Sequence, residues 1–339
     1  MIPFPLIRFP FWDSAEKPAP VHESLPEPAP VQQAVVLPVP QKSILNIGPD
    51  FAIDTRDWQS SGDRDAILAS SGFGKSYLAG VMTEEILECG GLVFIIDPEG
   101  ENYTLADKYP LLIVGGDHKT APLDLDTATR EDIDQIVRVA LTKGVSIIWD
   151  LSERTQKNQQ ELFTMIGGAL FSAQDKQEMR RPVKFIVEEA RVFAPQKGTG
   201  LPQVEGETCL SVFENIATRG RKRGINMLLA TQRPASISKD ILSQCNRWWF
   251  GGMQSTQDCN ALKPYLEEAG VTAEEIKTLP KGAGEFYYYA NGETIKIKTR
   301  KRKCKHGGST PMVKAGSHKV ASKADVAEAL QEMWGIQND

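Results

Sequence analysis

The stretch from Ile67 to Ser76, ILASSGFGKS, constrains the fold of this chain more than any other. Its first residues have the composition of a strand end, a loop of small residues follows, and the run from Tyr77 to Glu88 predicts a helix. This arrangement binds nucleotide phosphates, because backbone N–H groups of the loop and of the helix N-terminus converge on the anion. We therefore predict an ATP-binding phosphate loop formed by Ser70, Ser71, Gly72, Phe73, Gly74, Lys75 and Ser76.

Two side chains of this loop carry the predicted chemistry. We expect Lys75 to reach the outer phosphates and the Ser76 hydroxyl to ligate Mg²⁺. Ala69 holds the first position of the G-x-x-x-x-G-K-[ST] pattern, where Gly is common, and its single methyl group should leave the loop intact. A chance turn of small residues is the alternative interpretation, and the preceding strand counts against it.

Composition limits the class of protein and its partners. Hydrophobic content of 41% and charged content of 24% are typical of a soluble globular protein. A net charge of −5 means that any contact with nucleic acid must be local. The five cysteines form no C-x-x-C pair, which predicts reduced thiols and a cytoplasmic location. We expect no signal peptide and no transmembrane segment, since no apolar run approaches the roughly 20 residues of a span.

The first 42 residues differ from the rest, because they contain 10 of the 21 prolines. Alternation of Pro with Ala, Val and Glu favours extended conformations with a solvated backbone. Residues 1–42 are therefore predicted to form a Pro-rich arm. It is either a plain tether or a docking arm with Phe4, Phe9, Phe11 and Trp12 as anchors, and we favour a tether with an anchor at its tip.

Strand-like and helix-like patterns alternate from about residue 43, as a parallel sheet requires. The predicted strands are Ala66–Ala69, Gly91–Asp97, Leu111–Val114, Val145–Asp150, Val183–Glu188, Ile225–Thr231 and Trp248–Gly251. The predicted helices are Lys75–Glu88, Arg130–Thr142, Gln156–Gln174, Glu207–Thr218 and Lys239–Cys245. Several strands are continuously apolar, which indicates that helices cover both faces. The predicted fold class is α/β, a mostly parallel sheet flanked by helices in one ATPase domain over residues 43–295.

Polar residues end three of the predicted strands, at the sheet edge where ligands bind in open α/β folds. In VKFIVEEARVFAP, we expect Glu188 to hold the hydration shell of Mg²⁺ and Glu189 to polarise the attacking water. Asp97 and Glu101 follow a second strand, and Gln232 follows a third, where an amide can sense the γ-phosphate. Solvated strand ends are the alternative for each site alone.

The C-terminal part is different in kind. Gly284–Lys298 predicts a hairpin with Asn291-Gly292 at its turn, and a terminal helix is predicted over Lys323–Trp334. We treat residues 296–339 as a basic C-terminal segment, in which contact with nucleic-acid phosphates and a solvated tail are both open. The basic residues proposed to touch nucleic acid are Lys296, Lys298, Arg300, Lys301, Arg302, Lys303 and Lys305.

Four motifs give this chain a resemblance to the HerA/FtsK-like P-loop ATPases, and to HerA-type DNA translocases in particular. They are ASSGFGKS (69–76), FIIDPEGE (94–101), FIVEEARVFAP (185–195) and ENIATRGRKRGINMLLATQRPASISKDILSQCN (214–246). The resemblance implies a RecA-like core in a homo-oligomeric ring, commonly a hexamer, that pumps double-stranded DNA with ATP and Mg²⁺.

The resemblance also implies roles for single residues. Lys75 and Ser76 hold phosphate and Mg²⁺, Glu189 is similar to the catalytic Glu, and Gln232 to the sensor. Asp97 looks like the acidic residue after the second strand. Arg221, in the G-R-K turn, resembles the finger that enters the neighbouring subunit's site.

Two departures from the family pattern bear on function. Glu188 replaces the usual Asp before the catalytic Glu, and no N-terminal barrel domain is evident, which puts barrel contacts with a nuclease partner in doubt. The compact build resembles viral and mobile-element forms. We predict a ring-forming motor that translocates double-stranded DNA. The alternatives are a packaging or conjugative coupling ATPase docked on a portal or membrane channel, and a nucleotide-switched assembly subunit without motor activity.

Overall fold

The structure is a computed structural model that describes residues 44–54, 62–176, 180–197 and 199–308. All of them belong to one compact unit, Pro40–Asp339. The predicted N-terminal arm, residues 1–42, and the predicted terminal helix, Lys323–Trp334, lie outside the described residues. Among the helices of the described part, none has the length and apolar character needed to cross a membrane.

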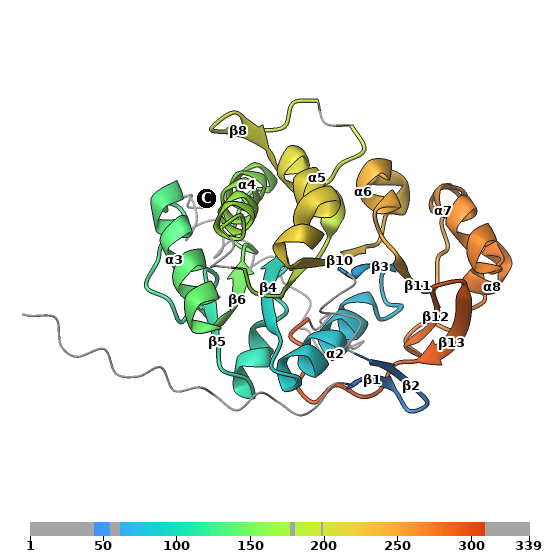
Figure 1. Ribbon diagram of the computed structural model, residues 1–339. Coiled ribbons are helices and arrows are strands. Elements are labelled where there is room, and N and C mark those ends of the chain that lie inside the picture. The colour runs from blue at the N-terminus through green and yellow to red at the C-terminus, as the bar shows by residue number, and fades with distance from the viewer. Residues whose placement is uncertain (1–43, 55–61, 177–179, 198, 309–339) are drawn as a thin grey trace, which may run out of the picture. The chain divides into compact units, whose positions relative to one another are not determined.

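A nine-stranded sheet forms the middle layer of this unit (Figure 1), with the strand order β13-β12-β11-β3-β10-β7-β4-β6-β5. Every strand runs parallel to its neighbours except β12 and β13, which are antiparallel. The predicted α/β class with a mostly parallel sheet is confirmed. The strands are β3 (Arg64–Leu68), β4 (Leu92–Asp97), β5 (Leu111–Val114), β6 (Ser146–Asp150), β7 (Val183–Val187), β10 (Ile225–Thr231), β11 (Arg247–Phe250), β12 (Glu285–Ala290) and β13 (Glu293–Lys298).

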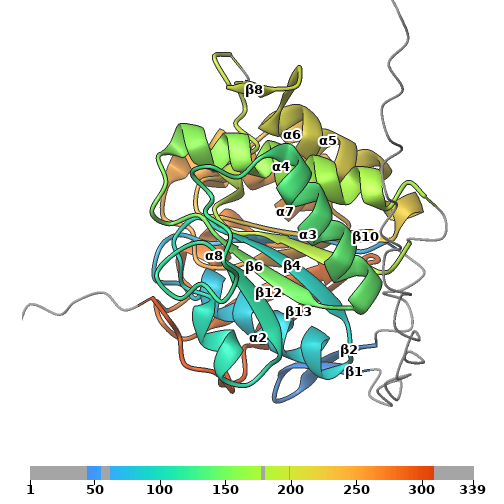
Figure 2. The same cartoon turned by 90° about the vertical axis from the view of Figure 1, so that its left-hand side faces the viewer.

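Separate layers cover the two faces of the sheet (Figure 2). One face carries α2 (Lys75–Glu88) and an antiparallel hairpin, β1 (Ile44–Gly48) with β2 (Phe51–Asp54). The opposite face carries α3 (Arg130–Lys143), α4 (Gln156–Ala173), α5 (Cys209–Arg219), α6 (Lys239–Ser243) and α7 (Thr256–Ala269). Shorter elements complete the described chain: α8 (Ala273–Lys277), β8 (Gln203–Val204), β9 (Glu207–Thr208), and the 3-10 helices η1 (Tyr103–Asp107), η3 (Ala190–Val192), η4 (Gly220–Arg223) and η5 (Pro234–Ser236).

Each central strand contributes to two hydrophobic cores, one on each face of the sheet. In β4, Phe94 and Ile96 pack with the α3–α7 layer, whereas Val93 and Ile95 pack with α2 and the β1–β2 hairpin. Successive side chains of a strand point to opposite faces, so a strand covered on both sides must be apolar at every position. This is the physical reason for the continuous apolar runs in the sequence.

The predicted hairpin near the C-terminus is confirmed, and it extends the sheet. β12 pairs with β11 on one side and with β13 on the other, both in antiparallel register. Asn291 and Gly292 at the turn have φ values of 52° and 80°, the left-handed pair that a two-residue hairpin of this twist requires. The predicted domain boundary between residues 295 and 296 falls inside β13, so the sheet continues past it.

A buried group of charges lies at the amino ends of β7, β3 and β11, where β10 separates β7 from β3. Lys184 of β7 donates to Asp65 of β3, and the indole N–H of Trp249 in β11 donates to the other carboxylate oxygen at 3.0 Å. Lys184 and Asp65 are both fully buried. Burial alone would raise the pKa of Asp65, but Lys184 and Arg247 hold it below its ordinary value. The carboxylate therefore stays charged in the core.

We expect Lys184→Met to lower the free energy of unfolding by about 3–5 kcal/mol, because it leaves the Asp65 charge buried without its ammonium partner. Urea denaturation followed by circular dichroism measures this. Lys157→Met is the matched control, since Lys157 pairs with Glu161 on an exposed helix face and should change stability by less than about 0.5 kcal/mol. Equal effects of the two changes would show that the buried pair contributes nothing.

Candidate nucleotide-binding site

The predicted phosphate loop connects β3 to α2 at the carboxyl end of the sheet. The Ser70 amide donates to the carbonyl of Gly252 at 2.9 Å, and the Phe73 side chain is buried in the core beside α2, so both ends of the loop are anchored. Ala69 is also fully buried there, which accommodates its methyl group at the position where Gly is common. The Phe73 side chain thus supports the loop from below.

The loop has the geometry of an anion site. Gly72 and Gly74 have φ values of 81° and 90°, conformations that favour Gly. α2 begins at Lys75 after the N-cap residue Gly74, without a side-chain cap and without an acidic residue in its first turn. An uncapped helix N-terminus presents its N–H groups and the positive end of the helix dipole to a bound phosphate.

Lys75 lies at the centre of a buried polar cluster built from three adjacent strands. Its Nζ is 2.9 Å from Glu189 Oε1 and 3.6 Å from Glu188 Oε2, and both carboxylates follow β7 directly. Gln232, which follows β10, donates from Nε2 to the same Oε1 of Glu189 at 2.7 Å. The structure therefore brings together four of the residues that the sequence placed on separate strands.

The charges of this cluster support one another. Burial alone would lower the pKa of Lys75, but Glu188 and Glu189 raise it above its ordinary value, so the side chain stays protonated. A buried charge is stable only when it is paired. A nucleotide phosphate entering the loop would compete with Glu189 for Lys75, which couples phosphate binding to release of the carboxylate.

Glu189 adopts a strained backbone conformation. Its φ of 43° and ψ of 47° lie in the left-handed region, where a residue with a side chain costs about 1–3 kcal/mol. The strain turns the chain from β7 into η3 and points the carboxylate at Lys75 and Gln232. Such outliers occur where the surrounding structure holds a side chain in one position for chemistry.

The residues present fit a Mg²⁺ ion that shares its shell with phosphate oxygens. The hydroxyl of Ser76 lies 3.5 Å from Lys75 Nζ, and Glu188 Oε2 lies 3.6 Å from the same atom, so both predicted metal residues lie next to the ammonium that would hold the phosphates. No group of three His, Cys, Asp or Glu side chains within the described chain could hold a metal alone. Mg²⁺ commonly binds through one or two protein ligands, water and substrate phosphates.

Asp97 organises the loop that follows β4. Its carboxylate accepts from the amide of Gly100 at 2.9 Å, and from the amide and side-chain nitrogen of Asn102 at 2.8 and 2.9 Å. The side chain is buried, and burial with the nearby charge of Glu188 raises its pKa to about 7. Asp97 therefore shapes the loop that carries Glu101, and Glu101 itself reaches the cavity beside the phosphate loop.

One cavity of about 740 Å³ joins these groups to a part of the site that the sequence did not reveal. Its walls include the phosphate loop, Glu101 and Gln232, together with the turn over residues 282–284 and the segment that follows β13. Tyr77 and His306 also border it. These residues carry no known motif, so only the folded chain shows that they meet the phosphate loop.

Arg221 lies far from this cluster within one chain. It belongs to η4, which precedes β10, whereas Gln232 follows the same strand. The seven residues of β10 separate the two by about 20 Å. The exposed Arg221 is thus at the opposite edge of the sheet from Lys75, and the predicted finger could act only on a neighbouring subunit's site.

The predicted nucleic-acid residues are divided by the structure. Arg300, Arg302 and Lys303 contact glutamates of α2, and Lys296 pairs with Glu285 of β12 at 3.0 Å. The other members of the basic run are exposed: Lys298, Lys301 and Lys305. The contact of the run with nucleic acid stays a prediction.

The fold and the site together define an α/β domain with a P-loop nucleotide-binding site. Residues 63–142 match the family model described as "Helicase HerA, central domain", which confirms the HerA-type resemblance for this segment. The chain is 40% identical over 65 residues to DNA double-strand break repair helicase HerA of Pyrococcus furiosus, covering 19% of this chain and 10% of the relative. It is 26% identical over 134 residues to the probable HerA helicase of Methanocaldococcus jannaschii, covering 39% and 24%.

A solved structure supports the fold. The bacterial conjugative coupling protein TrwB superposes with a TM-score of 0.58 at 12% identity, covering 79% of this chain and 91% of that one. At this identity the likeness concerns the fold alone. The chain spans a quarter or less of the two HerA relatives.

We expect Glu189→Gln to keep ATP binding while reducing turnover at least 100-fold, because the amide keeps the size of the side chain but loses its basicity. Lys75→Ala should abolish turnover, since it removes the cation of the phosphate loop. A filter-binding assay with labelled ATP and phosphate release measure the two quantities. If Glu189→Gln turned over ATP at the wild-type rate, Glu189 would have no catalytic role.

The raised pKa of Asp97 predicts a pH dependence of stability. The native side chain holds its proton up to about pH 7, whereas the unfolded one releases it near 3.8, so the native state binds more protons between these values. The free energy of unfolding contributed by this group therefore falls as pH rises from about 4 to 7.

Asp97→Asn should remove this fall. The difference in unfolding free energy between pH 5 and pH 8, measured by urea denaturation without nucleotide, should shrink by about 2 kcal/mol relative to wild type. Comparing differences cancels the cost of the altered loop. Asp117 is exposed, so Asp117→Asn is the control and should keep the wild-type difference between pH 5 and pH 8. A wild-type difference in Asp97→Asn as well would contradict the prediction.

Proposed function

We propose that this protein hydrolyses ATP by in-line attack of water on the γ-phosphate. The single observation that carries this proposal is the convergence of Lys75, Glu189 and Gln232 at the phosphate loop, with Glu189 held between the other two. Lys75 would hold the outer phosphates, and Glu189 would accept the proton of the attacking water. Gln232 would orient Glu189 and the attacking water. Bound Mg²⁺, held by Ser76 and Glu188, would neutralise charge on the phosphates.

We further infer that the protein is a ring-forming motor that translocates double-stranded DNA. The match of residues 63–142 to the HerA central domain supports this inference. The placement of Arg221 supports it too, because an arginine at the far edge of the sheet can complete a site only between subunits. A homohexamer is the expected ring. The free thiols of the described cysteines agree with the cytoplasmic location that we propose.

The test is ATP turnover with and without duplex DNA, followed by electron microscopy of the protein with an ATP analogue and DNA. A DNA-stimulated ATPase that forms rings around the duplex is the expected result. Turnover that DNA leaves unchanged, with no rings, would contradict the motor. A portal or channel protein that co-purifies with the rings would instead identify a packaging or conjugative coupling ATPase.

A nucleotide-switched assembly subunit is the second candidate. Glu188 stands where related motors commonly use Asp, and in this structure it faces Lys75 at 3.6 Å. A longer side chain at the metal position would slow turnover without weakening nucleotide binding. ATP-dependent assembly with very slow hydrolysis, which Glu188→Asp accelerates, would favour this candidate over the motor.

Arg221→Ala should leave ATP binding intact and reduce hydrolysis by about 10³–10⁵-fold, because the finger neutralises charge that develops only in the transition state. Mixtures of Arg221→Ala with Lys75→Ala subunits should recover activity, since some interfaces pair an intact phosphate loop with an intact finger. The measurement is ATPase rate against mixing ratio at fixed total protein.

The neighbouring exposed Lys222→Ala serves as the control for loss of positive charge in η4 and should keep near wild-type turnover. Each variant alone should be inactive. If mixed rings then form and every mixture is still inactive, Arg221 does not act across a subunit interface.

A further inference from the structure

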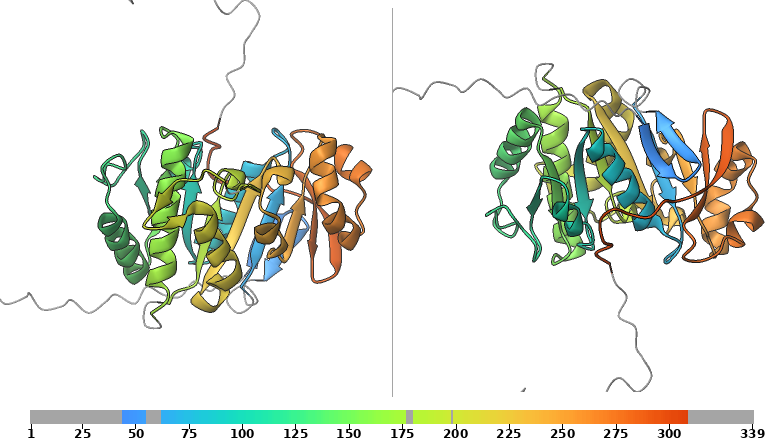
Figure 3. Two further views of the ribbon diagram at one scale, coloured as in Figure 1. Left: turned by 90° about the horizontal axis from the view of Figure 1, so that it is seen from above. Right: turned by 90° about the horizontal axis from the view of Figure 1, so that it is seen from below.

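The residues after β13, Thr299–Gly308, cross the outer surface of α2 and are called the C-terminal strap below. Figure 3, right, shows this dark red segment running over α2 from the β12–β13 hairpin. The Arg300 amide donates to the carbonyl of Ile47 at 2.8 Å, and Thr104 donates to the carbonyl of Lys305 at 2.7 Å. The strap is thus held by elements at both ends of its path.

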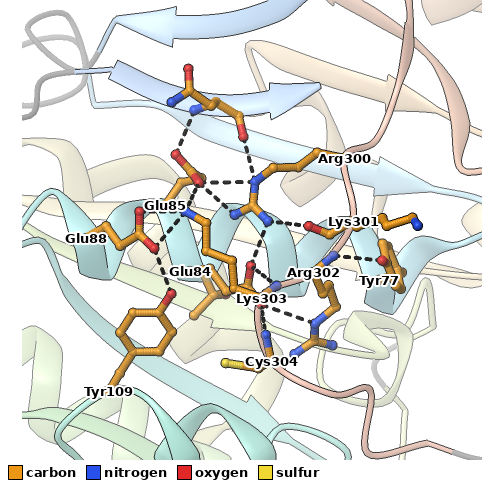
Figure 4. Close-up of polar contacts among 12 residues, drawn as sticks. Tyr77, Glu84, Glu85, Glu88, Tyr109, Arg300, Lys301, Arg302, Lys303 and Cys304 are labelled. Carbon is orange, nitrogen blue, oxygen red and sulfur yellow. Dashed lines mark hydrogen bonds and ion pairs between the residues drawn. The ribbon is translucent and has the colours of Figure 1, made fainter. Parts of the chain in front are cut away.

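Ion pairs fix the strap to α2. Arg300 contacts Glu84 at 2.9 Å and Glu85 at 2.7 Å, and Lys303 contacts Glu85 at 2.9 Å and Glu88 at 2.6 Å (Figure 4). Glu84 and Glu85 are completely buried. Removing one partner of a buried pair is strongly unfavourable, so these contacts hold the strap in one position.

Backbone groups add to the same attachment. The amides of Lys303 and Cys304 donate to Glu84 Oε1 at 2.9 and 2.8 Å, and the amide of Arg302 donates to the Tyr77 hydroxyl at 2.7 Å. The Arg302 guanidinium lies directly on Gly80 of α2, where a Cβ atom would come within 2.5 Å of it. The strap is therefore a docked part of the ATPase domain, close to the first turn of the phosphate-loop helix.

The docked strap borders the same 740 Å³ cavity as the phosphate loop. Its contribution comes from Thr299, Arg300, Lys301, His306 and Gly308. A nucleotide whose outer phosphates occupy the loop must extend into this cavity. The C-terminal strap and the phosphate loop, about 220 residues apart in the chain, thus form one site.

The cations of this cavity are not equivalent. Lys75 is paired with Glu188 and Glu189, and Arg300 is paired with glutamates of α2. Lys298 at the end of β13 also lines the cavity and is exposed. Within the strap, Lys301 is exposed and makes no ion pair with any residue that the structure describes. In Figure 4 its side chain extends past Tyr77, away from the three glutamates. Its ammonium is the charge of the strap that remains available to a ligand in the cavity.

We propose that Lys301 binds the phosphate chain of the nucleotide, as a second cation supplied by the C-terminal strap. The proposal rests on the proposed function, because it assigns a further contact to the same nucleotide site. The anchored neighbours Arg300 and Lys303 position Lys301, which explains why a basic run of this composition is folded onto α2. The run is then a nucleotide-binding element rather than a solvated tail.

The test compares Lys301→Gln with wild type in equilibrium binding, by calorimetry, of a non-hydrolysable ATP analogue, ADP and adenosine in the presence of Mg²⁺. A lost charge-assisted contact predicts a dissociation constant raised about 10–100-fold for the analogue and ADP, and unchanged for adenosine. The effect should shrink in 0.5 M KCl, because salt screens an exposed cation. Lys301→Arg should restore most of the affinity.

Lys305→Gln is the matched control, since Lys305 is an exposed lysine of the same strap that does not border the cavity. It should bind all three ligands like wild type. Wild-type protein that fails to bind the analogue would overturn the proposed function itself. Wild-type binding that Lys301→Gln leaves unchanged would overturn the role of Lys301 alone. Duplex DNA binding of Lys301→Gln and Lys305→Gln is measured as well. If both variants bind nucleotide like wild type but bind DNA equally weakly, the strap contacts DNA and the proposal is overturned.

Discussion

The buried ion pair between Lys75 and Glu189 is the interaction on which the rest of the site depends. It requires β3, β7 and β10 to be adjacent and parallel, so that the phosphate loop, the glutamates and Gln232 end at one edge. The apolar middle of each strand supplies the burial that makes an unpaired charge costly there. Cores on both faces of the sheet therefore stabilise the arrangement of polar groups at its edge.

At the opposite end of the strands, buried polar groups are also paired, but with one another. Lys184, Asp65 and Trp249 satisfy one another in the buried core at the amino ends of the strands. Buried polar groups that match only one partner disfavour alternative strand pairings. One end of the sheet thus carries polar groups that can exchange partners with a ligand, and the other carries polar groups that cannot.

Sequence reasoning worked where the signal is local and periodic. The helix Lys75–Glu88 and the strands Leu111–Val114 and Ile225–Thr231 have the predicted bounds, because apolar runs and the Lys-Ser start mark them. The helix α7 was missed; it contains Pro264, a residue that commonly ends helices. The docking of the C-terminal strap was missed for another reason. Its charges are neutralised by glutamates more than 200 residues earlier, and nothing local distinguishes such a run from a solvated tail.

The attachment of the strap has a consequence for how the domain is made. Glu84 and Glu85 become buried on a helix that is synthesised more than 200 residues before Arg300 and Lys303. Until then the two carboxylates lack their ion pairs with Arg300 and Lys303, and the hairpin β1–β2 lacks the bond from Arg300 to Ile47. Co-translational folding can assemble the central strands, but the nucleotide site is completed only when residues 299–308 have been synthesised. A truncated product would therefore carry a phosphate loop on an unfinished domain.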